Sequence, residues 1–307
     1  MTTAIRSIPG VCEARLFTGA AASAGGPPDL FVEVPHGADR ARHFTALYSE
    51  LKGSFPEGLI DFFHVNTDAG ARQYAEALAA LLVAQDPRRS ALVLSSEIPR
   101  TLIDCNRRID ASPEEFKAGK VTPGLPPYLR DPDDRVLLRA RHAAWVEQLE
   151  AAYGWVCGSG GLGLMAHTYA PRSVDVEVDD QIVESLRRAY RPEIEPTWPL
   201  RPEVDLIARD DQGVVRAAPL VERLGRAFSE DGFEVKVSAT YPLHPSTLGY
   251  SSVVKYEPRV ACVEVRRDLL VRAFTPLLQL EADDAKVARV AGALCKAVRG
   301  ALAGLGR

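Results

Sequence analysis

Short apolar runs alternate with helical segments along the chain, and this alternation restricts the possible folds more than any other feature of the sequence. The apolar runs are residues 29–36, 59–65, 91–94, 164–167, 204–208, 234–239 and 260–266. The segments with helical character are residues 38–51, 71–83, 135–153, 218–230 and 283–305. Strands that alternate with helices are typical of a layered α/β fold with a largely parallel sheet.

Three segments interrupt this alternation. Residues 112–134 and 174–198 combine Pro with many charged residues and are predicted to cross the surface as irregular loops. Residues 241–250 are polar and aromatic with Pro and Gly, and they come shortly before the last strand. This third segment is placed to line a pocket, or it simply connects two elements.

The composition excludes several classes of protein. There are 37 Lys and Arg residues against 41 Asp and Glu, a net charge of −4, whereas a nucleic-acid-binding protein needs clustered basic residues. No apolar run is long enough to cross a bilayer, and we find no secretory signal. The five cysteines are an odd number without a C-x-x-C pair, which argues against a disulfide scaffold. We therefore expect a cytoplasmic protein with neither nucleic acid nor membrane as its partner.

Ligands of α/β proteins bind beyond the carboxyl ends of parallel strands, so polar residues at these ends are candidates for a site. His36 ends the first strand, and Asp39 follows three residues later. Histidine with a carboxylate is a common pair of zinc ligands. By itself this short motif is weak evidence, and a loop histidine beside a helix-capping Asp39 is the alternative. His167 ends residues 164–167 and is either a third ligand or a partly buried, hydrogen-bonded histidine. Three such ligands would leave one position of a catalytic zinc for water.

Two further carboxylates have positions that need an explanation. Asp68 precedes the helix 71–83 and is predicted to cap it, with the orientation of a metal ligand as the alternative. Glu264 stands between apolar residues of the last strand, where an unpaired carboxylate is costly to bury. Either Arg266 or another cation pairs with Glu264, or this residue is the general base beside a zinc-bound water and then the general acid.

Arginines gather after the strand 91–94, at Arg100 and Arg107. The guanidinium group binds carboxylates through two parallel hydrogen bonds. Both residues are therefore candidates to hold a substrate carboxylate or to polarise its scissile carbonyl. A structural ion pair with Asp104 or Glu97 is the alternative.

Five motifs follow one another in the order P-H-G-A-D, N-T-D-A-G-A, I-P-R-T-L-I-D-C-N-R, A-H-T-Y-A-P and V-E-V-R-R-D. In this order they resemble the N-formylglutamate amidohydrolase family, which looks like a distant relative of the zinc carboxypeptidases and zinc deacylases. The carboxypeptidase pattern consists of H-x-x-E, an N-R pair, a strand-ending histidine and E-x-R. Its counterparts here are His36-x-x-Asp39, Asn106-Arg107, His167 and Glu264-x-Arg266.

The resemblance implies a three-layer α/β/α sandwich around a mixed, mostly parallel sheet of about eight strands, as in the zinc carboxypeptidases. It also implies one zinc ion per chain, Zn²⁺ bound by His36, Asp39 and His167. Glu264 would then be the general base and acid of a hydrolytic reaction.

The same resemblance implies that Asn106 and Arg107 hold a carboxylate of the substrate and that Arg100 stabilises the oxyanion. The resulting hypothesis is a zinc-dependent amidohydrolase. It would cleave an N-acyl or N-formyl amino acid, such as N-formylglutamate, to the acid and the free amino acid. Its partner would be a small molecule or short peptide that carries a carboxylate.

Three alternatives stay open. The protein is a zinc carboxypeptidase or amidase that acts on a peptide, a hydrolase with Cys105 as nucleophile, or a non-catalytic binding protein on the same fold. Because the candidate ligands and the candidate base come from both halves of the chain, we expect one domain over residues 1–307.

Overall fold

One mixed sheet forms the centre of the computed structural model, which describes residues 5–119 and 121–305. In these residues the sheet has seven strands in the order β1-β3-β2-β4-β7-β5-β6. The strands are β1 (Cys12–Thr18), β2 (Leu30–Val34), β3 (Ser90–Ser96), β4 (Leu162–Tyr169), β5 (Val204–Ile207), β6 (Val235–Val237) and β7 (Val260–Arg266). Strands β3, β2, β4 and β7 run parallel, whereas β1 and the β5–β6 pair run in the opposite direction.

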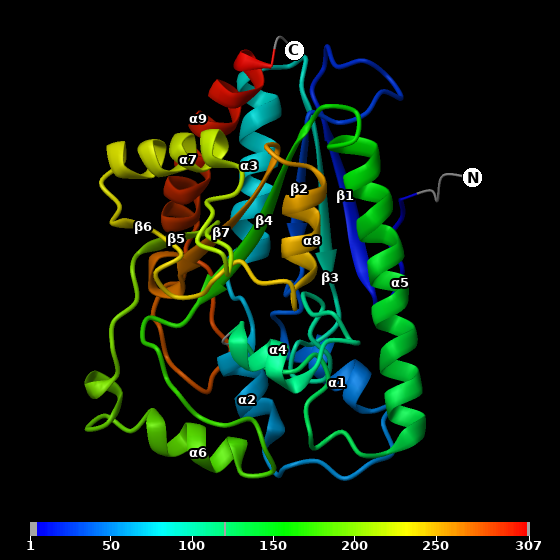
Figure 1. The fold of residues 1–307 in the computed structure, drawn as a ribbon, viewed down its shortest axis with the longest axis vertical. Coiled ribbons are helices and arrows are strands. Elements are labelled where there is room, and N and C mark those ends of the chain that lie inside the picture. Colours follow the sequence, from blue (N-terminus) through cyan, green and yellow to red (C-terminus); the bar gives the residue numbers. More distant parts are fainter. Residues whose placement is uncertain (1–4, 120, 306–307) are drawn as a thin grey trace.

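Helices cover both faces of the sheet (Figure 1). One face packs against α3 (Ala71–Gln85), α7 (Ala218–Glu230) and α9 (Asp284–Gly304), and the other against α5 (Pro132–Val156) and α8 (Leu248–Lys255). Successive strand residues point to opposite faces, so Val32 joins the first core and Phe31 the second. The predicted α/β/α sandwich with a mixed, mostly parallel sheet is confirmed, with seven described strands against the expected eight.

Short helices gather beyond the carboxyl ends of the parallel strands, at the lower end of the view in Figure 1. They are α1 (Ala41–Tyr48), α2 (Leu59–Asn66), α4 (Pro113–Ala118) and α6 (Ile182–Ala189), with the 3₁₀ turns η1 (Glu195–Thr197) and η2 (Arg267–Leu269). The prediction of a strand over residues 59–65 is wrong. Leu59, Phe62 and Phe63 are buried together in α2, and this spacing of three and four residues is that of a helix face.

Other local predictions differ in detail. The two segments predicted as irregular loops contain α4 and α6. The antiparallel edge strand β1 was not predicted at all. The five cysteines are all free and buried, as their odd number and wide spacing indicated. Among the described residues no helix has the length and apolar character needed to span a membrane.

Candidate metal centre and active site

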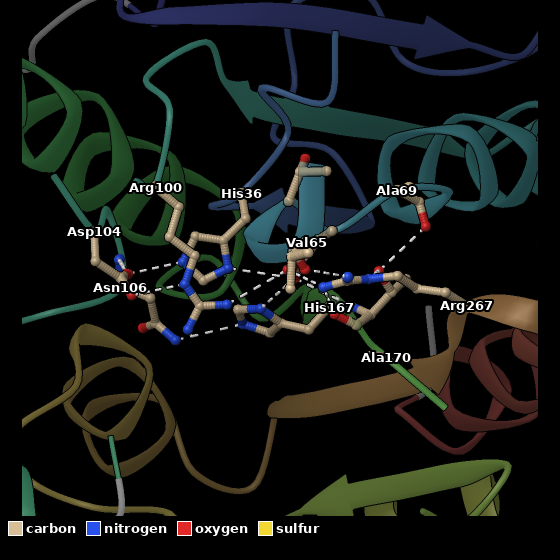
Figure 2. A network of polar contacts seen from close by, with 12 residues as sticks. His36, Val65, Ala69, Arg100, Asp104, Asn106, His167, Ala170 and Arg267 are labelled. Atoms are coloured by element: carbon tan, nitrogen blue, oxygen red, sulfur yellow. Dashed lines mark hydrogen bonds and ion pairs between the residues drawn. The ribbon is translucent and has the colours of Figure 1, made fainter. Parts of the chain in front are cut away.

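The neighbouring parallel strands β2 and β4 bring two histidines together at their carboxyl ends. His36 follows β2 after Pro35, and His167 lies near the end of β4. Their ring centroids are 5.1 Å apart, and both side chains are almost completely buried. The turn after His36 needs a glycine, because a Cβ on Gly37 would collide with Ser95 Oγ. The two histidines predicted as metal ligands therefore lie side by side (Figure 2).

A third side chain, Asp68, reaches this pair from the turn that precedes α3. Its Oδ2 atom lies 3.3 Å from His36 Nδ1 and 3.1 Å from His167 Nδ1. The backbone N–H of Thr168 donates to the same oxygen at 3.1 Å. The predicted capping role is wrong, because Gly70 is the N-cap of α3 and no side chain caps this helix. In the part of the chain that the structure describes, His36, Asp68 and His167 form a group of potential ligands whose atoms lie within 4.8 Å of one another.

The structure does not bring Asp39 to the two histidines. Asp39 is buried, but its Oδ2 accepts a hydrogen bond from Gln73 Nε2 at 3.0 Å, and its Oδ1 lies 3.7 Å from Arg40 Nε. The chain is extended at Arg40, directly before α1. The carboxylate that lies between the histidines belongs to a residue 32 positions after His36, not three.

The protonation pattern around His36 fits a bound cation. His36 Nε2 lies 2.8 Å from Asp104 Oδ1, and because a carboxylate only accepts hydrogen bonds, this contact favours the tautomer with the proton on Nε2. A neutral His36 then turns the lone pair of Nδ1 toward the Asp68 carboxylate, and two acceptors face each other. A second proton or a metal cation resolves this conflict. Two histidines and one carboxylate, with a further carboxylate on the outer nitrogen of His36, are compatible with a bound metal ion.

Arginines surround the carboxylates of this cluster (Figure 2). Arg100 Nε donates to Asp104 Oδ2 at 3.0 Å, and Arg100 Nη1 lies 3.5 Å from Asp68 Oδ1. Arg267 Nη2 lies 3.8 Å from the same Asp68 oxygen, which has no hydrogen-bond partner among the described residues. Arg100 thus lies beside the cluster, and it forms the ion pair with Asp104 that was the alternative to a role toward the substrate.

Neighbouring histidines and arginines lower the pKa of both buried aspartates of the site. Burial alone raises the pKa of Asp68, but the charge of His36 and the hydrogen bonds from both histidines outweigh it, and the net pKa is well below 3.8. For Asp104 burial also raises the pKa, and the charges of Arg107, Arg100 and His36 lower it well below the same value. The positive charges around the cluster thus favour the ionised form of both carboxyl groups.

Glu264 is the register partner of His167, since β4 and β7 pair in parallel. Its Oε2 atom is buried and has no hydrogen-bond partner among the described residues. Burial raises the pKa of Glu264 to about 7, with the charge of His167 acting in the opposite direction and that of Asp68 in the same direction. A carboxyl group with such a pKa can both take and return a proton near neutral pH.

Asn106 and Arg107 also lie at the site, but their side chains contact other residues of the protein. Asn106 Oδ1 accepts from the backbone N–H of Gly249, and its Nδ2 lies 3.4 Å from His167 Nε2. Arg107 Nη2 lies 3.3 Å from Asp104 Oδ2, and the other guanidinium nitrogens donate to two backbone carbonyls. The Arg107 side chain is only 4% exposed, which leaves it little surface for a substrate.

A cavity of about 230 Å³ opens beside these groups. Of the predicted site residues, those that line it are His36, Arg100, Asn106, Arg107, His167 and Glu264. The segment 241–250 lines it too, through Tyr241, Pro242, Leu243, Thr247 and Gly249.

Cys105 is not among the lining residues, and burial raises the pKa of its thiol far above the ordinary value. This placement gives no support to Cys105 as a nucleophile.

Comparison with known proteins gives similarity at the level of the fold. No model of a protein family matches the sequence, and no curated protein matches it. The crystal structure of N-formylglutamate amidohydrolase from Ralstonia eutropha is similar to this chain, with a TM-score of 0.56, 18% identity, and coverage of 96% of this chain and 98% of the other. A gene product of Agrobacterium tumefaciens is similar with a TM-score of 0.54, 15% identity, and coverage of 99% and 100%. Over nearly its whole length, the chain therefore shares the fold of a solved N-formylglutamate amidohydrolase, the family that its motif order resembles.

Proposed function

We propose that this protein is a metal-dependent hydrolase that cleaves the amide bond of an N-acyl amino acid, with N-formyl amino acids such as N-formylglutamate as the reference substrates. The observation that carries the proposal is the position of Glu264, a carboxyl group with a free buried oxygen, beside the cluster of His36, Asp68 and His167. The shared fold with the amidohydrolase of Ralstonia eutropha supports the same class of reaction.

In this proposal His36, Asp68 and His167 hold one zinc ion per chain, and Asp68 takes the place that the sequence suggested for Asp39. A zinc ion held by three protein ligands supplies an acidified water and polarises the carbonyl of the substrate. Asp104 fixes the ring of His36 through the 2.8 Å contact to Nε2. Such outer contacts orient a ligand and increase its basicity.

In the proposed hydrolysis, Glu264 carries out the proton transfers. Its unpartnered Oε2 accepts a proton from the attacking water, and the same carboxyl group then donates this proton to the nitrogen of the leaving amine. Arg100 lines the same cavity and keeps its positive charge, since Asp104 and Asp68 raise its pKa against the opposite effect of burial. Its guanidinium group is thus available to stabilise negative charge on the carbonyl oxygen.

Positive charge in the cavity favours a substrate that carries a carboxylate. The arginines that line it are Arg100, Arg107, Arg172, Arg201 and Arg267. Because the proposed ligands and the proposed base come from residues 36 to 264, we also propose that residues 1–307 act as one domain.

The test is a comparison of metal-free and zinc-loaded protein. Release of free amine from N-formyl and N-acetyl amino acids is expected only with the loaded protein, and short peptides with a free carboxyl end serve as the competing substrate class. Faster hydrolysis of the peptides would favour a carboxypeptidase. Failure of the zinc-loaded protein to hydrolyse any of these amides would contradict the proposal.

A further inference from the structure

Arg201 has different contacts from Arg100, Arg107 and Arg267, the arginines nearest the cluster. It lines the same cavity as Arg100 and Glu264, and it lies shortly before β5, the strand that pairs with β7. Its backbone is fixed on both sides, because its N–H donates to Pro171 O and its carbonyl accepts from Arg266 Nη1 at 3.0 Å. Arg201 is therefore a rigidly held cation beside the proposed base.

The hydrogen-bond partners of the Arg201 guanidinium group are all neutral. Nε donates to Ser173 Oγ at 3.0 Å, Nη1 to Ala170 O at 3.4 Å, and Nη2 to Tyr241 OH at 2.8 Å. The group also lies over two aromatic rings, 5.1 Å from the centroid of Tyr169 and 5.6 Å from that of Tyr241. Among the described residues no carboxylate lies within ion-pair distance of it.

The arginines nearest the cluster have a different environment. Arg100 and Arg107 both contact Asp104, and Arg267 lies near Asp68. These three arginines lie within ion-pair distance of a carboxylate, whereas Arg201 does not among the described residues. A guanidinium group has five N–H donors, and three of those of Arg201 are used. The remaining donors suit a carboxylate, which this group binds through two hydrogen bonds.

The wall of the cavity next to Arg201 is apolar. The segment that follows β4 contributes Val174, Val176 and Val178, and α6 with the residue after it contributes Ile182, Leu186 and Tyr190. These side chains pack on one another as part of the second core. An apolar substituent would be buried against this wall, whereas a charged one would lose its hydration there.

We propose that Arg201 binds the carboxylate of the substrate and that this apolar wall receives its side chain. The inference rests on the proposed amide hydrolysis and narrows its substrate class to N-acyl amino acids with one carboxylate and an apolar side chain. Arg107, the residue that the sequence suggested for this role, instead supports Asp104.

The test combines two substrates with two variants. N-formyl-leucine and N-formyl-leucinamide differ only in the carboxylate, so the zinc-loaded wild-type protein is expected to favour the acid by about 10- to 100-fold in kcat/KM, the range of a charge-assisted hydrogen bond. In Arg201→Met this preference disappears, mainly through KM. Arg259→Met removes an arginine that does not line the cavity and that donates to Gly160 O, and it is expected to keep the preference.

Two further measurements report substrate binding without turnover and test the apolar wall. Calorimetric titration of N-formyl-leucine into zinc-loaded Glu264→Gln, with and without Arg201→Met, reports binding without turnover. N-formylglutamate, compared with N-formyl-leucine on the wild-type protein, tests the apolar wall and is expected to be the poorer substrate. Hydrolysis with no preference for the acid, or an equal loss in both arginine variants, overturns the inference and leaves the proposed function intact. Absence of any amide hydrolysis overturns both.

Discussion

His167 and Glu264 occupy paired positions on β4 and β7, two neighbouring parallel strands. His167 contacts Asp68 in the proposed metal cluster, and Glu264 has a buried oxygen without a hydrogen-bond partner among the described residues. Paired residues of adjacent strands point to the same face of a sheet. The pairing of the two strands therefore places the proposed proton acceptor beside the proposed metal cluster.

Replacement of Glu264 by Gln removes the proton acceptor and keeps the shape of the side chain. We expect kcat to fall by about 10²- to 10⁴-fold, the usual contribution of a general base. The zinc content should remain that of the wild-type protein, because Glu264 is not a ligand in this account. Full activity of a zinc-loaded Glu264→Gln protein would contradict the assigned role.

In the proposed site, Asp104 contacts His36 Nε2 and orients this ligand without binding the metal itself. Asp104→Asn weakens the contact to His36 Nε2, and we expect the zinc affinity to fall by about 10- to 100-fold, the range known for such outer contacts. The measurement is competition with a chelator of known affinity, with circular dichroism as the check that the variant is folded. A folded variant with unchanged zinc affinity would refute the role of Asp104.

Gly37 permits the close turn that positions His36. A methyl group at this position would collide with Ser95 Oγ and lie 3.0 Å from the backbone oxygen of Ser96. Gly37→Ala is therefore expected to lower both the thermal midpoint and the zinc affinity. The matched control is Gly292→Ala in α9, where a Cβ meets nothing within 4 Å and the helix gains up to about 1 kcal/mol. Equal behaviour of the two variants would show that the turn has no such constraint.

Glu33 makes the stability of the fold depend on pH. The side chain is fully buried in β2, Tyr153 OH donates to its Oε2 at 2.7 Å, and its Oε1 has no hydrogen-bond partner among the described residues. Burial raises its pKa from 4.5 to about 7, against the smaller opposite effect of the Tyr153 hydrogen bond. Between these two values the folded protein keeps a proton that the unfolded chain releases, so the free energy of unfolding falls as pH rises through this window.

At pH values above this window, the ionisation of buried Glu33 lowers the free energy of unfolding by about 3 kcal/mol. Glu33→Gln cannot ionise and is expected to be more stable than the wild-type protein at pH 8, with little difference at pH 4. Urea denaturation at both pH values gives the comparison, and the difference between the two proteins removes the effect of all other titrating groups. A variant that loses stability at pH 8 would show that the ionised form of Glu33 is accommodated.

The sheet and three of the site residues could be predicted because they follow local rules. His36, His167 and Glu264 are polar residues on apolar strands, and parallel strands bring their carboxyl ends to one edge. Asp68 was assigned to the wrong role because its local pattern, an aspartate shortly before a helix, is also that of a cap. Only the packing of α3 under β2 and β4 turns its carboxylate to the histidines.

The contacts of Asp39 and Arg201 also depend on tertiary packing that the local sequence does not show. The three-residue spacing of His36 and Asp39 suggested a shared ligand set, but the backbone after Asp39 is extended and its side chain contacts Gln73 instead. Arg201 lies just beyond the segment 174–198, which was predicted as an irregular loop. Its lack of a carboxylate partner is a property of the assembled fold that no short stretch of sequence encodes.

The identity of the carboxylate ligand is the central claim, and one measurement tests it most directly. Wild-type protein, Asp68→Asn and Asp39→Asn are each loaded with zinc, passed over a desalting column and analysed for metal per chain. Our account predicts about one zinc in the wild-type protein and in Asp39→Asn, and a large loss in Asp68→Asn, because Asp68 lies between both histidines. Retention of zinc by Asp68→Asn together with its loss from Asp39→Asn would contradict it.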